Sequence, residues 1–371
     1  MRRRANGLAL VAVVLAVVGV IGCIVGAVID LAAFQRAWLC AYVFWLGVPL
    51  AGVTLVLVHD LSGGEWMETA RPVLGAAIAT MPLATLAGIP AWVGLHSLYA
   101  WTHAGSGLPN LAYLNPGFFF IRYAICLVLW NLLAAFALWA PRAGSLPIAP
   151  SLSWISGIGL AALALSASFA AIDWILSLAP TFWSSAFPYA QTASWFNTGM
   201  ALVVMCVALV GWPIGARRDH TADHMADLAR ILLATTIFWA YVEFIQFLII
   251  WEENLKTEIP WYLTHLHSPW HPALDVSVAL GFVIPFVVLL WAPPKRSRAI
   301  VAAIAAAIVA SRLANTWWLI MPEFKDGTPF WLDVAAVLAL GGAMVMLFAF
   351  ALRHARRLAP GRRMIWSVDH G

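Results

Sequence analysis

The sequence has few charges. Of its 371 residues, 10% are Asp, Glu, Lys or Arg and 63% are apolar, whereas soluble globular chains are about 25% charged. The net charge of +4 is spread over short loops instead of being gathered in one patch, so no nucleic-acid-binding surface is expected. These shortages exclude a soluble two-domain enzyme and favour an integral membrane protein.

Cysteine is also scarce, and the four cysteines are isolated in apolar runs (Cys23, Cys40, Cys126 and Cys206). No CxxC or CxxCH motif occurs, so neither a cysteine-ligated cluster nor a c-type haem is expected. A membrane-embedded b-type haem is not expected either, because only His96 lies inside a predicted helix. We predict that this chain binds no cofactor of its own, with a quinone as the one alternative left open.

Apolar runs of about 20 residues, long enough to cross the ~30 Å hydrocarbon layer, recur ten times. They predict a single all-α polytopic membrane domain over residues 1–371. The predicted spans are 8–30, 38–58, 73–99, 117–140, 152–178, 187–213, 228–251, 273–293, 298–320 and 330–352. The first run also resembles a signal peptide, but it continues to Ile29 without an A-x-A site, which favours a retained anchor.

The basic residues predict the orientation. One set of loops and termini holds Arg2, Arg3, Arg4, Arg71, Arg142, Arg217, Arg218, Lys295, Arg296, Arg298, Arg353, Arg356, Arg357, Arg362 and Arg363. The opposite set holds Arg36, Lys256 and Lys325. The positive-inside rule therefore predicts both termini in the cytoplasm, in agreement with an even number of spans.

The loops are too short to form a domain, so any soluble catalysis must come from partner proteins. The longest outer loop, 252–272, contains His265, His267 and His271. If this loop were helical, the i, i+4 pair His267 and His271 would be placed to bind a metal. Pro269 and Pro272 argue against a continuous helix, so we favour a polar interfacial loop.

The ionisable residues of the helices are distributed unevenly. On the predicted topology the outer half or boundary holds Asp30, Arg122, Asp173, Glu252, Glu253, Asp275 and Asp333, while Glu243 and Arg312 lie deeper. Charged side chains inside a membrane normally face a protein interior or a water-filled cavity. The pattern predicts a polar access route that opens on the outer face and stops near the middle of the membrane.

The span 228–251 contains the most informative acid. One stripe of this helix carries Thr236, Trp239, Glu243, Gln246 and Ile250. A carboxylate within hydrocarbon costs roughly 2.5–3.5 kcal/mol on insertion scales. Two interpretations remain open. Either Glu243 takes part in proton movement or quinone-headgroup binding, or it forms a buried ion pair with Arg312 that fixes helix packing.

Two further spans supply candidate partners. In 152–178, Ser166, Asp173 and Ser177 share one helix face, although Asp173 has the alternative of pairing with an arginine such as Arg122. In 298–320, Arg312 and Asn315 are three residues apart, hence on neighbouring positions of one face. The candidates for a proton pathway or quinone cavity are Asp173, Glu243, Gln246, Arg312, Ser166, Ser177, Thr236 and Asp275.

A series of motifs in one order resembles a known family. They are YVFWLGVPLAG (42–52), HDLSGGEWMETARP (59–72), LYAW (98–101), YLNPGFFFIR (113–122), FAAIDWILSLAPTFWSS (169–185), FWAYVEFIQFLIIWEEN (238–254), PFVVLLWAPPKR (285–296) and the tryptophan pair 317–318 before Pro322. With these motifs the chain resembles the polysulfide-reductase-type membrane subunits. The resemblance is greatest to the second such membrane subunit of alternative complex III, a bacterial quinol:electron-acceptor oxidoreductase.

The resemblance implies an architecture and a setting. Helices 2–5 (about 38–178) and 6–9 (about 187–320) are expected to form two four-helix bundles, with helices 1 and 10 peripheral. The implied location is the bacterial inner (cytoplasmic) membrane. The implied partners are membrane lipid, a second homologous membrane subunit, and multihaem cytochrome c and iron–sulfur subunits on the outer side; a terminal oxidase is a further partner that it allows.

By the same resemblance, Asp173, Glu243 and Gln246 match the motif positions expected to carry a proton path in a subunit without a redox centre. The resulting hypothesis is a non-redox membrane subunit of a respiratory quinol-oxidising complex, supplying a proton half-channel or a quinone-side scaffold. A secondary transporter that uses the same carboxylates and a purely structural membrane anchor are the alternatives.

Overall fold

The structure is a computed structural model that describes residues 2–64, 66–103, 110–140, 152–210, 221–325 and 327–358. Within these ranges the regular elements are all helical. They are α1 (Arg2–Ile29), α2 (Leu31–Ser62), α3 (Trp66–Ile78), α4 (Met81–Leu86), α5 (Ile89–Val93), α6 (Leu95–Leu98), η1 (Ala100–Thr102), α7 (Pro116–Trp139), α8 (Ser153–Trp174), η2 (Leu176–Leu178), α9 (Phe187–Val210), α10 (Thr221–Glu253), α11 (Ile259–Leu266), α12 (His271–Val278), the π-helix η4 (Ala279–Val283), α13 (Ile284–Leu290), α14 (Ala292–Arg296), α15 (Arg298–Ile320), η5 (Met321–Glu323) and α16 (Phe330–Leu358).

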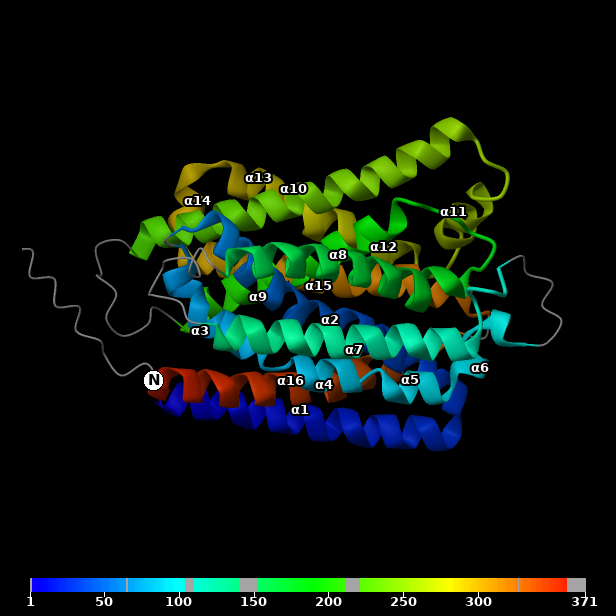
Figure 1. The fold of residues 1–371 in the computed structure, drawn as a ribbon, viewed down its shortest axis with the longest axis horizontal. Coiled ribbons are helices and arrows are strands. Elements are labelled where there is room, and N and C mark those ends of the chain that lie inside the picture. The colour runs from blue at the N-terminus through cyan, green and yellow to red at the C-terminus, as the bar shows by residue number, and fades with distance from the viewer. Residues whose placement is uncertain are drawn as a thin grey trace, which may run out of the picture.

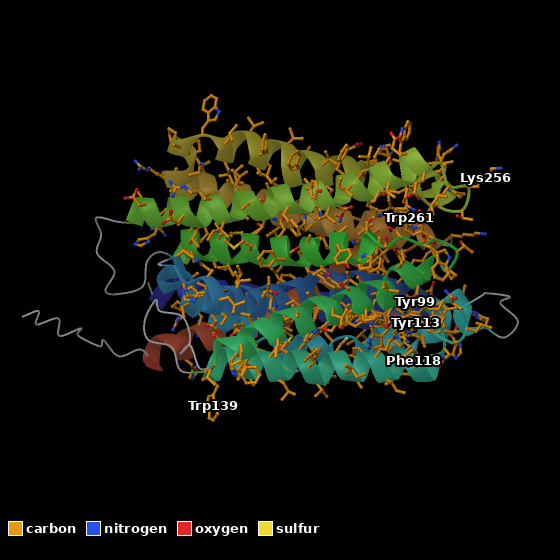
Figure 2. All side chains as sticks on the ribbon, turned by 45° about the horizontal axis from the view of Figure 1, so that its top comes forward. Tyr99, Tyr113, Phe118, Trp139, Lys256 and Trp261 are labelled. Atoms are coloured by element: carbon orange, nitrogen blue, oxygen red, sulfur yellow. The ribbon has the colours of Figure 1, made fainter. Side chains whose placement is uncertain are left out.

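The long helices run side by side along one direction (Figure 1). Among the described residues, ten segments are long and apolar enough to cross a membrane, which confirms the prediction of an all-helical, multi-pass membrane protein. α1 begins and α16 ends at one end of the bundle, and α6 and α11 lie at the other (Figure 1). Tyr99, Tyr113 and Trp261 also lie at the α11 end, opposite Trp139 (Figure 2).

The centre of the bundle is formed by α2, α9 and α15, with α10 packed on α9. Where α2 and α9 meet, a Cβ on Gly199 would lie 2.8 Å from the Gly47 carbonyl oxygen. Small residues at this point let the two backbones approach closely. The Trp195 indole then donates a hydrogen bond of 2.7 Å to the Val43 carbonyl of α2, so the contact is polar as well as close.

α1 and α16 lie against each other along one edge, and α16 also packs on α2 and α3. Glycines again allow the close approach. A Cβ on Gly22 would lie 2.7 Å from the Ala335 Cβ, and a Cβ on Gly342 would lie 2.7 Å from the Ala16 Cα. The two terminal spans thus form a pair beside the other helices. The division of the remaining spans into two four-helix bundles stays a prediction.

The boundary between the first two spans differs from the prediction. α2 begins at Leu31, directly after α1, whereas the sequence predicted that the second span would begin at residue 38. Asp30 separates the two helices because its carboxylate accepts the Ala33 amide at 3.0 Å as an N-cap, a role that short acidic side chains favour. Asp30 therefore caps the start of α2, and the access route stays a prediction.

Two spans are interrupted. The third is broken into α3, α4, α5 and α6, since Pro82 and Pro90 lack the amide that a continuous helix requires. In the eighth, the π-helical turn η4 contains Gly281 and precedes Pro285. Such turns arise where a helix accommodates an irregular hydrogen-bond pattern. The apolar runs alone predicted continuous helices at both places.

The segment 252–272, which the predicted topology assigns to the outer face, is not simply a loop. It contains α11, and only 267–270 interrupt the helix before α12 begins, so the interfacial-loop prediction was wrong for 259–266. The prolines do prevent one continuous helix. His267 is exposed and His265 is fully buried, and no group of three metal-ligating side chains occurs in the described ranges.

Candidate functional site

A cavity of about 510 Å³ lies between α10, α11, α12, η4 and α15. Its wall is mostly aromatic and aliphatic, with a few polar side chains that converge on one another, as in small-molecule sites. The polar and indole-bearing members are Trp239, Tyr241, Glu243, Tyr262, Ser277, Asn315 and Trp318. The cavity extends from the middle of α10 to α11, and several of its lining residues on α10 and α12 are exposed at the surface, among them Tyr241, Phe244 and Val278.

Glu243 is the acid of this cavity. The carboxylate accepts a hydrogen bond of 3.1 Å from the indole of Trp239, one turn earlier on α10, and Asn315 of α15 lies beside it. The side chain is partly accessible, because it faces the cavity. A carboxyl group at this position can accept a proton from, or pass one to, a molecule in the cavity.

Arg312 lies behind Trp239, fully buried. Its guanidinium carbon is 3.2 Å from the centre of the Trp239 ring system, a cation–π contact. Its hydrogen bonds are long, from Nε to the Ser311 hydroxyl at 3.3 Å and from Nη2 to the Ser277 carbonyl at 3.5 Å. The remaining terminal nitrogen, Nη1, has no hydrogen-bond partner within the described structure.

Glu243 and Arg312 do not form a direct ion pair. Both side chains are described, and no guanidinium nitrogen of Arg312 lies within 4.0 Å of a carboxylate oxygen of Glu243. The ion-pair alternative for these two residues was therefore wrong in its direct form. The physical reason is Trp239, whose ring face covers the guanidinium while its N–H holds the carboxylate.

Gln246 closes the α11 side of the site. The side chain is buried, and its amide nitrogen donates to the Tyr262 hydroxyl at 3.3 Å. Burial raises the pKa of the Tyr262 phenol, and the negative charge of Glu243 raises it further. Tyr262 thus remains a hydroxyl donor that faces the same cavity as Glu243.

Trp239, Tyr262 and Ser277 were not among the predicted site residues. The sequence did place Trp239 on the stripe of Glu243, four residues before it, but assigned it no role. Tyr262 and Ser277 came from segments whose local geometry the sequence did not reveal. The Ser277 hydroxyl donates to the Asn315 amide oxygen at 3.3 Å, which links α12 to α15 at the cavity floor.

Thr236 lies away from the cavity lining and is fully buried. Its hydroxyl accepts a hydrogen bond of 3.1 Å from Asn197 of α9, and the hydroxyl of Thr235 accepts another at 3.1 Å. Such interhelical amide–hydroxyl bonds are typical links between membrane helices. Thr236 is therefore placed to connect α9 with α10.

Asp173 forms a separate polar centre with Arg122 of α7. The pair is bidentate, with Nε–Oδ2 of 2.6 Å and Nη2–Oδ1 of 2.9 Å. The guanidinium also lies over the rings of Tyr113 at 3.9 Å and Phe118 at 4.4 Å, both at the α11 end of the bundle (Figure 2). The structure therefore confirms the alternative in which Asp173 forms an ion pair with Arg122.

The two serines of the same helix face have their hydroxyls hydrogen-bonded within the protein. Ser177 donates to the Asp173 carbonyl at 2.6 Å, and Ser166 donates to the Ala162 carbonyl at 2.7 Å while accepting from the Trp130 indole at 2.9 Å. Asp173, Ser166 and Ser177 do not line the Glu243 cavity. The structure thus divides the eight candidates into separate places.

Asp275 lies on the outside of α12, with its side chain 72% exposed and 3.7 Å from the His271 imidazole. It does not line the cavity. The reason is helical phase, since Ser277 and Val278 of the same stretch turn toward α10 and α15 instead.

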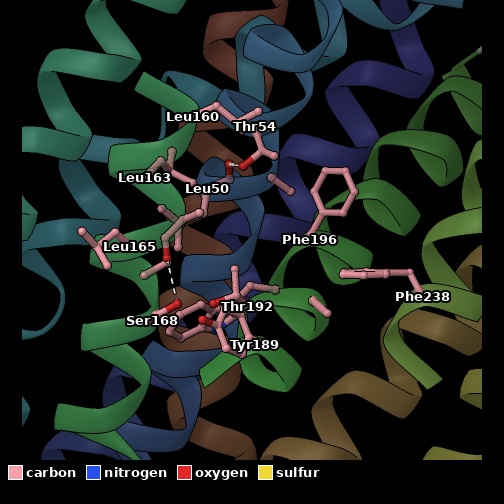
Figure 3. A pocket seen from close by; sticks show the side chains of 15 residues that line it. Leu50, Thr54, Leu160, Leu163, Leu165, Ser168, Tyr189, Thr192, Phe196 and Phe238 are labelled. Atoms are coloured by element: carbon pink, nitrogen blue, oxygen red, sulfur yellow. Dashed lines mark hydrogen bonds between the residues drawn. The ribbon is translucent and has the colours of Figure 1, made fainter. Parts of the chain in front are cut away.

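A second hollow lies among α2, α8, α9 and α10 (Figure 3). Its volume is about 410 Å³. Leu165 and Phe238 line it and are largely exposed. The hydroxyls of Thr54, Ser168 and Thr192 in its wall each donate to a carbonyl of their own helix at 2.8–2.9 Å. Since these donors are used locally, the wall of the hollow is mostly apolar, and Tyr189 is its other hydroxyl-bearing member.

α11 is anchored by His265. The imidazole stacks on Trp261 with ring centroids 3.9 Å apart, its Nδ1 is 2.8 Å from the Trp261 carbonyl, and its Nε2 is 3.6 Å from Glu323 Oε1 of η5. Burial lowers the pKa of His265 from 6.5 to about 4, so the ring is neutral at physiological pH. This contact holds α11 over the end of the cavity.

Comparison of the chain with protein-family models found no match, and comparison with curated proteins found none either.

Proposed function

We propose that this chain is a non-redox integral membrane subunit of a bacterial respiratory quinol:electron-acceptor oxidoreductase similar to alternative complex III. In this proposal Glu243 handles protons in a half-channel open to the outer face. Partners of the chain are a second homologous membrane subunit and outer-side multihaem cytochrome c and iron–sulfur subunits. The resemblance of the sequence motifs supports the setting, and the cavity supports the chemistry.

The observation that carries the proposal is the state of Glu243. Its carboxylate faces a cavity within the membrane-crossing part of the chain and has no direct ion pair. A purely structural acid is normally neutralised by a cation at hydrogen-bond distance, as Asp173 is by Arg122. An acid without such a partner is suited to gain and lose a proton.

The orientation follows from the positive-inside rule. Both chain ends are proposed to face the cytoplasm, so the α11 end of the bundle faces outward. Among the residues on which this rests, Arg142, Arg217, Arg218, Arg362 and Arg363 lie outside the described residues. In this proposal a route from the outer face reaches Glu243 past Tyr262 and Leu266, the α11 residues that line the cavity.

A quinone headgroup is a second occupant that this cavity suits. Its volume lies in the range of small-molecule sites, about 300–1,000 Å³, and Glu243, Tyr262 and Asn315 offer hydrogen bonds beside aromatic walls. In this form of the proposal the chain supplies a quinone-side scaffold. It still contributes no redox centre.

A secondary transporter is the competing function, favoured by the interrupted third and eighth spans. Transporter sites form where broken helices occupy corresponding positions of two repeats. If helices 2–5 correspond to helices 6–9, the third span corresponds to the seventh, which is the continuous α10. The interruptions therefore do not correspond, and this weakens the transporter hypothesis.

Co-purification tests the proposal. The tagged chain is isolated from its native membranes in mild detergent, and the eluate is analysed by visible absorption and by mass spectrometry. Haem absorption together with iron–sulfur and homologous membrane subunits in constant ratio is the expected result. A chain that purifies alone and catalyses substrate uptake in proteoliposomes would instead establish a transporter.

A further inference from the structure

Trp239 occupies the space between the two charged groups of the cavity region. One edge of the indole donates its N–H to Glu243 at 3.1 Å, and the ring face covers the Arg312 guanidinium at 3.2 Å. The side chain is 4% exposed, so packing fixes its position. A single residue thus contacts both the acid and the cation while they remain apart.

The side chain of tryptophan suits this position for two reasons. Its π-face attracts a cation without accepting a proton, and its N–H donates one hydrogen bond without carrying charge. The N–H group thus partly stabilises the carboxylate of Glu243, and the ring face partly stabilises the guanidinium of Arg312. Neither ion gains the bidentate charge-assisted hydrogen bonds of a direct arginine–carboxylate pair, which Arg122 and Asp173 do form.

Arg312 is held against Trp239 from the opposite side by η4. A Cβ on Gly281 would lie 2.6 Å from the Ser311 hydroxyl and would overlap the guanidinium itself. The glycine of the π-helical turn therefore provides the space that the guanidinium occupies. With its weak hydrogen bonds and unpartnered Nη1, Arg312 would gain from any carboxylate that it could reach.

We propose that Trp239 is a positioning residue that keeps Arg312 from pairing directly with Glu243, so that Glu243 stays free to exchange a proton. This inference rests on the proposed function of Glu243. In the described part of the chain, the titratable groups nearest the carboxyl are Arg312 of α15 and Tyr262 of α11, and Tyr241 of α10 lines the same cavity. The α12 and η4 side of the cavity contributes neutral side chains, among them Ser277 and Phe282.

The proposal predicts opposite effects for two substitutions. Trp239→Leu removes the ring and lets Arg312 reach the carboxylate, so the titration midpoint of Glu243 moves to lower pH by at least about one unit. Trp239→Phe keeps a ring in the gap but removes the N–H bond to the ionised acid, so the midpoint moves to higher pH.

The measurement is infrared difference spectroscopy of the purified full chain across the neutral pH range. The carbonyl band of protonated Glu243 is identified as the band that Glu243→Gln removes. Trp251→Leu serves as the matched control, because Trp251 is a 68% exposed tryptophan of the same helix. This control is expected to leave the midpoint unchanged.

A second variant tests the cause of the shift. Adding Arg312→Gln to Trp239→Leu should abolish the downward shift, since the direct ion pair then cannot form. An unchanged or higher midpoint in Trp239→Leu, a downward shift that survives Arg312→Gln, or a lower midpoint in Trp239→Phe overturns the proposal. If Trp239→Leu does not fold, the Trp239→Phe result still decides.

The test of the positioning role of Trp239 can fail or succeed independently of the test of proton handling by Glu243. Shifts of the predicted signs in a protein whose turnover is insensitive to Glu243→Gln would support the positioning role and refute the proton-handling role. Unshifted midpoints with a Glu243-dependent turnover would refute the positioning role alone.

Discussion

Arg122 and Asp173 form a bidentate ion pair with nitrogen–oxygen distances of 2.6 and 2.9 Å, and both side chains are less than 9% exposed. The pair connects α7 to α8. It shows what full neutralisation of a buried acid looks like in this protein, and Glu243 lacks it. The two acids are therefore expected to respond differently to substitution.

Asp173→Asn should destabilise the fold by about 3–5 kcal/mol, because it leaves the Arg122 guanidinium buried without a carboxylate. Thermal unfolding in detergent measures the effect. Asp227→Asn is the control, since it breaks the exposed Arg230–Asp227 pair of α10, which should contribute less than about 1 kcal/mol. Normal stability of Asp173→Asn combined with reduced turnover would make Asp173 a proton carrier instead.

The double substitution Arg122→Met with Asp173→Leu provides a further check. Replacing both members of a buried ion pair by apolar residues of similar volume is often neutral. We expect the double variant to recover most of the stability lost in Asp173→Asn. A double variant as unstable as the single one would show that the contacts of Arg122 with Tyr113 and Phe118 stabilise the fold more than the ion pair does.

The pH dependence of stability should contain a contribution from His265. Its pKa falls from 6.5 to about 4 on folding because the ring is buried, so between these values the unfolded chain binds a proton that the folded chain does not. Stability from this residue is complete above pH 6.5 and declines as the pH falls toward 4, by about 3 kcal/mol in total. Unfolding measured at about pH 7 and about pH 5 should show a smaller loss in His265→Gln than in the native protein.

His267→Gln is the control for this experiment, since His267 is exposed on the same segment. It should leave the pH dependence unaltered. Equal losses on acidification in His265→Gln and the native protein would mean that the anchor of α11 does not titrate.

The contact between α1 and α16 is testable with two glycines. Gly342→Ala should lower the unfolding temperature, because the added Cβ would lie 2.7 Å from the Ala16 backbone, and overpacking typically costs about 1–3 kcal/mol. Gly157→Ala in α8 should be neutral or stabilising, since its Cβ would meet only Leu61 at 3.9 Å and alanine favours helix. Two variants of equal stability would contradict the close approach of α1 and α16.

The ten spans were predictable because a helix that crosses the hydrocarbon layer needs about 20 apolar residues, and such a run is visible in the sequence. An apolar run by itself does not show the helix interruptions at Pro82, Pro90 and Pro285, although proline removes a backbone donor wherever it occurs. α11 was missed because its eight residues lie between polar and proline-rich segments. Asp30 was assigned to the access route since its acidic type is visible in the sequence, whereas its capping geometry is not.

The acid of the site, Glu243, could be predicted from the sequence, but the arrangement of the residues around it could not. Glu243, Gln246 and Arg312 were identified because polar side chains in apolar helices are costly. Which cation meets which acid depends on helix rotation and on the third residue between them. The separation of Glu243 from Arg312 by Trp239 is a tertiary property, and so is the exclusion of Asp275 from the cavity.

The most direct test of the account is proton-coupled turnover of the purified complex carrying Glu243→Gln, measured as quinol oxidation and proton release together. A positioned proton-transferring group contributes a large factor to rate, so we expect turnover to fall at least about tenfold while subunit composition and haem content stay unchanged. Unchanged proton-coupled turnover, or loss of the assembled complex, would contradict the assignment of Glu243 to proton handling.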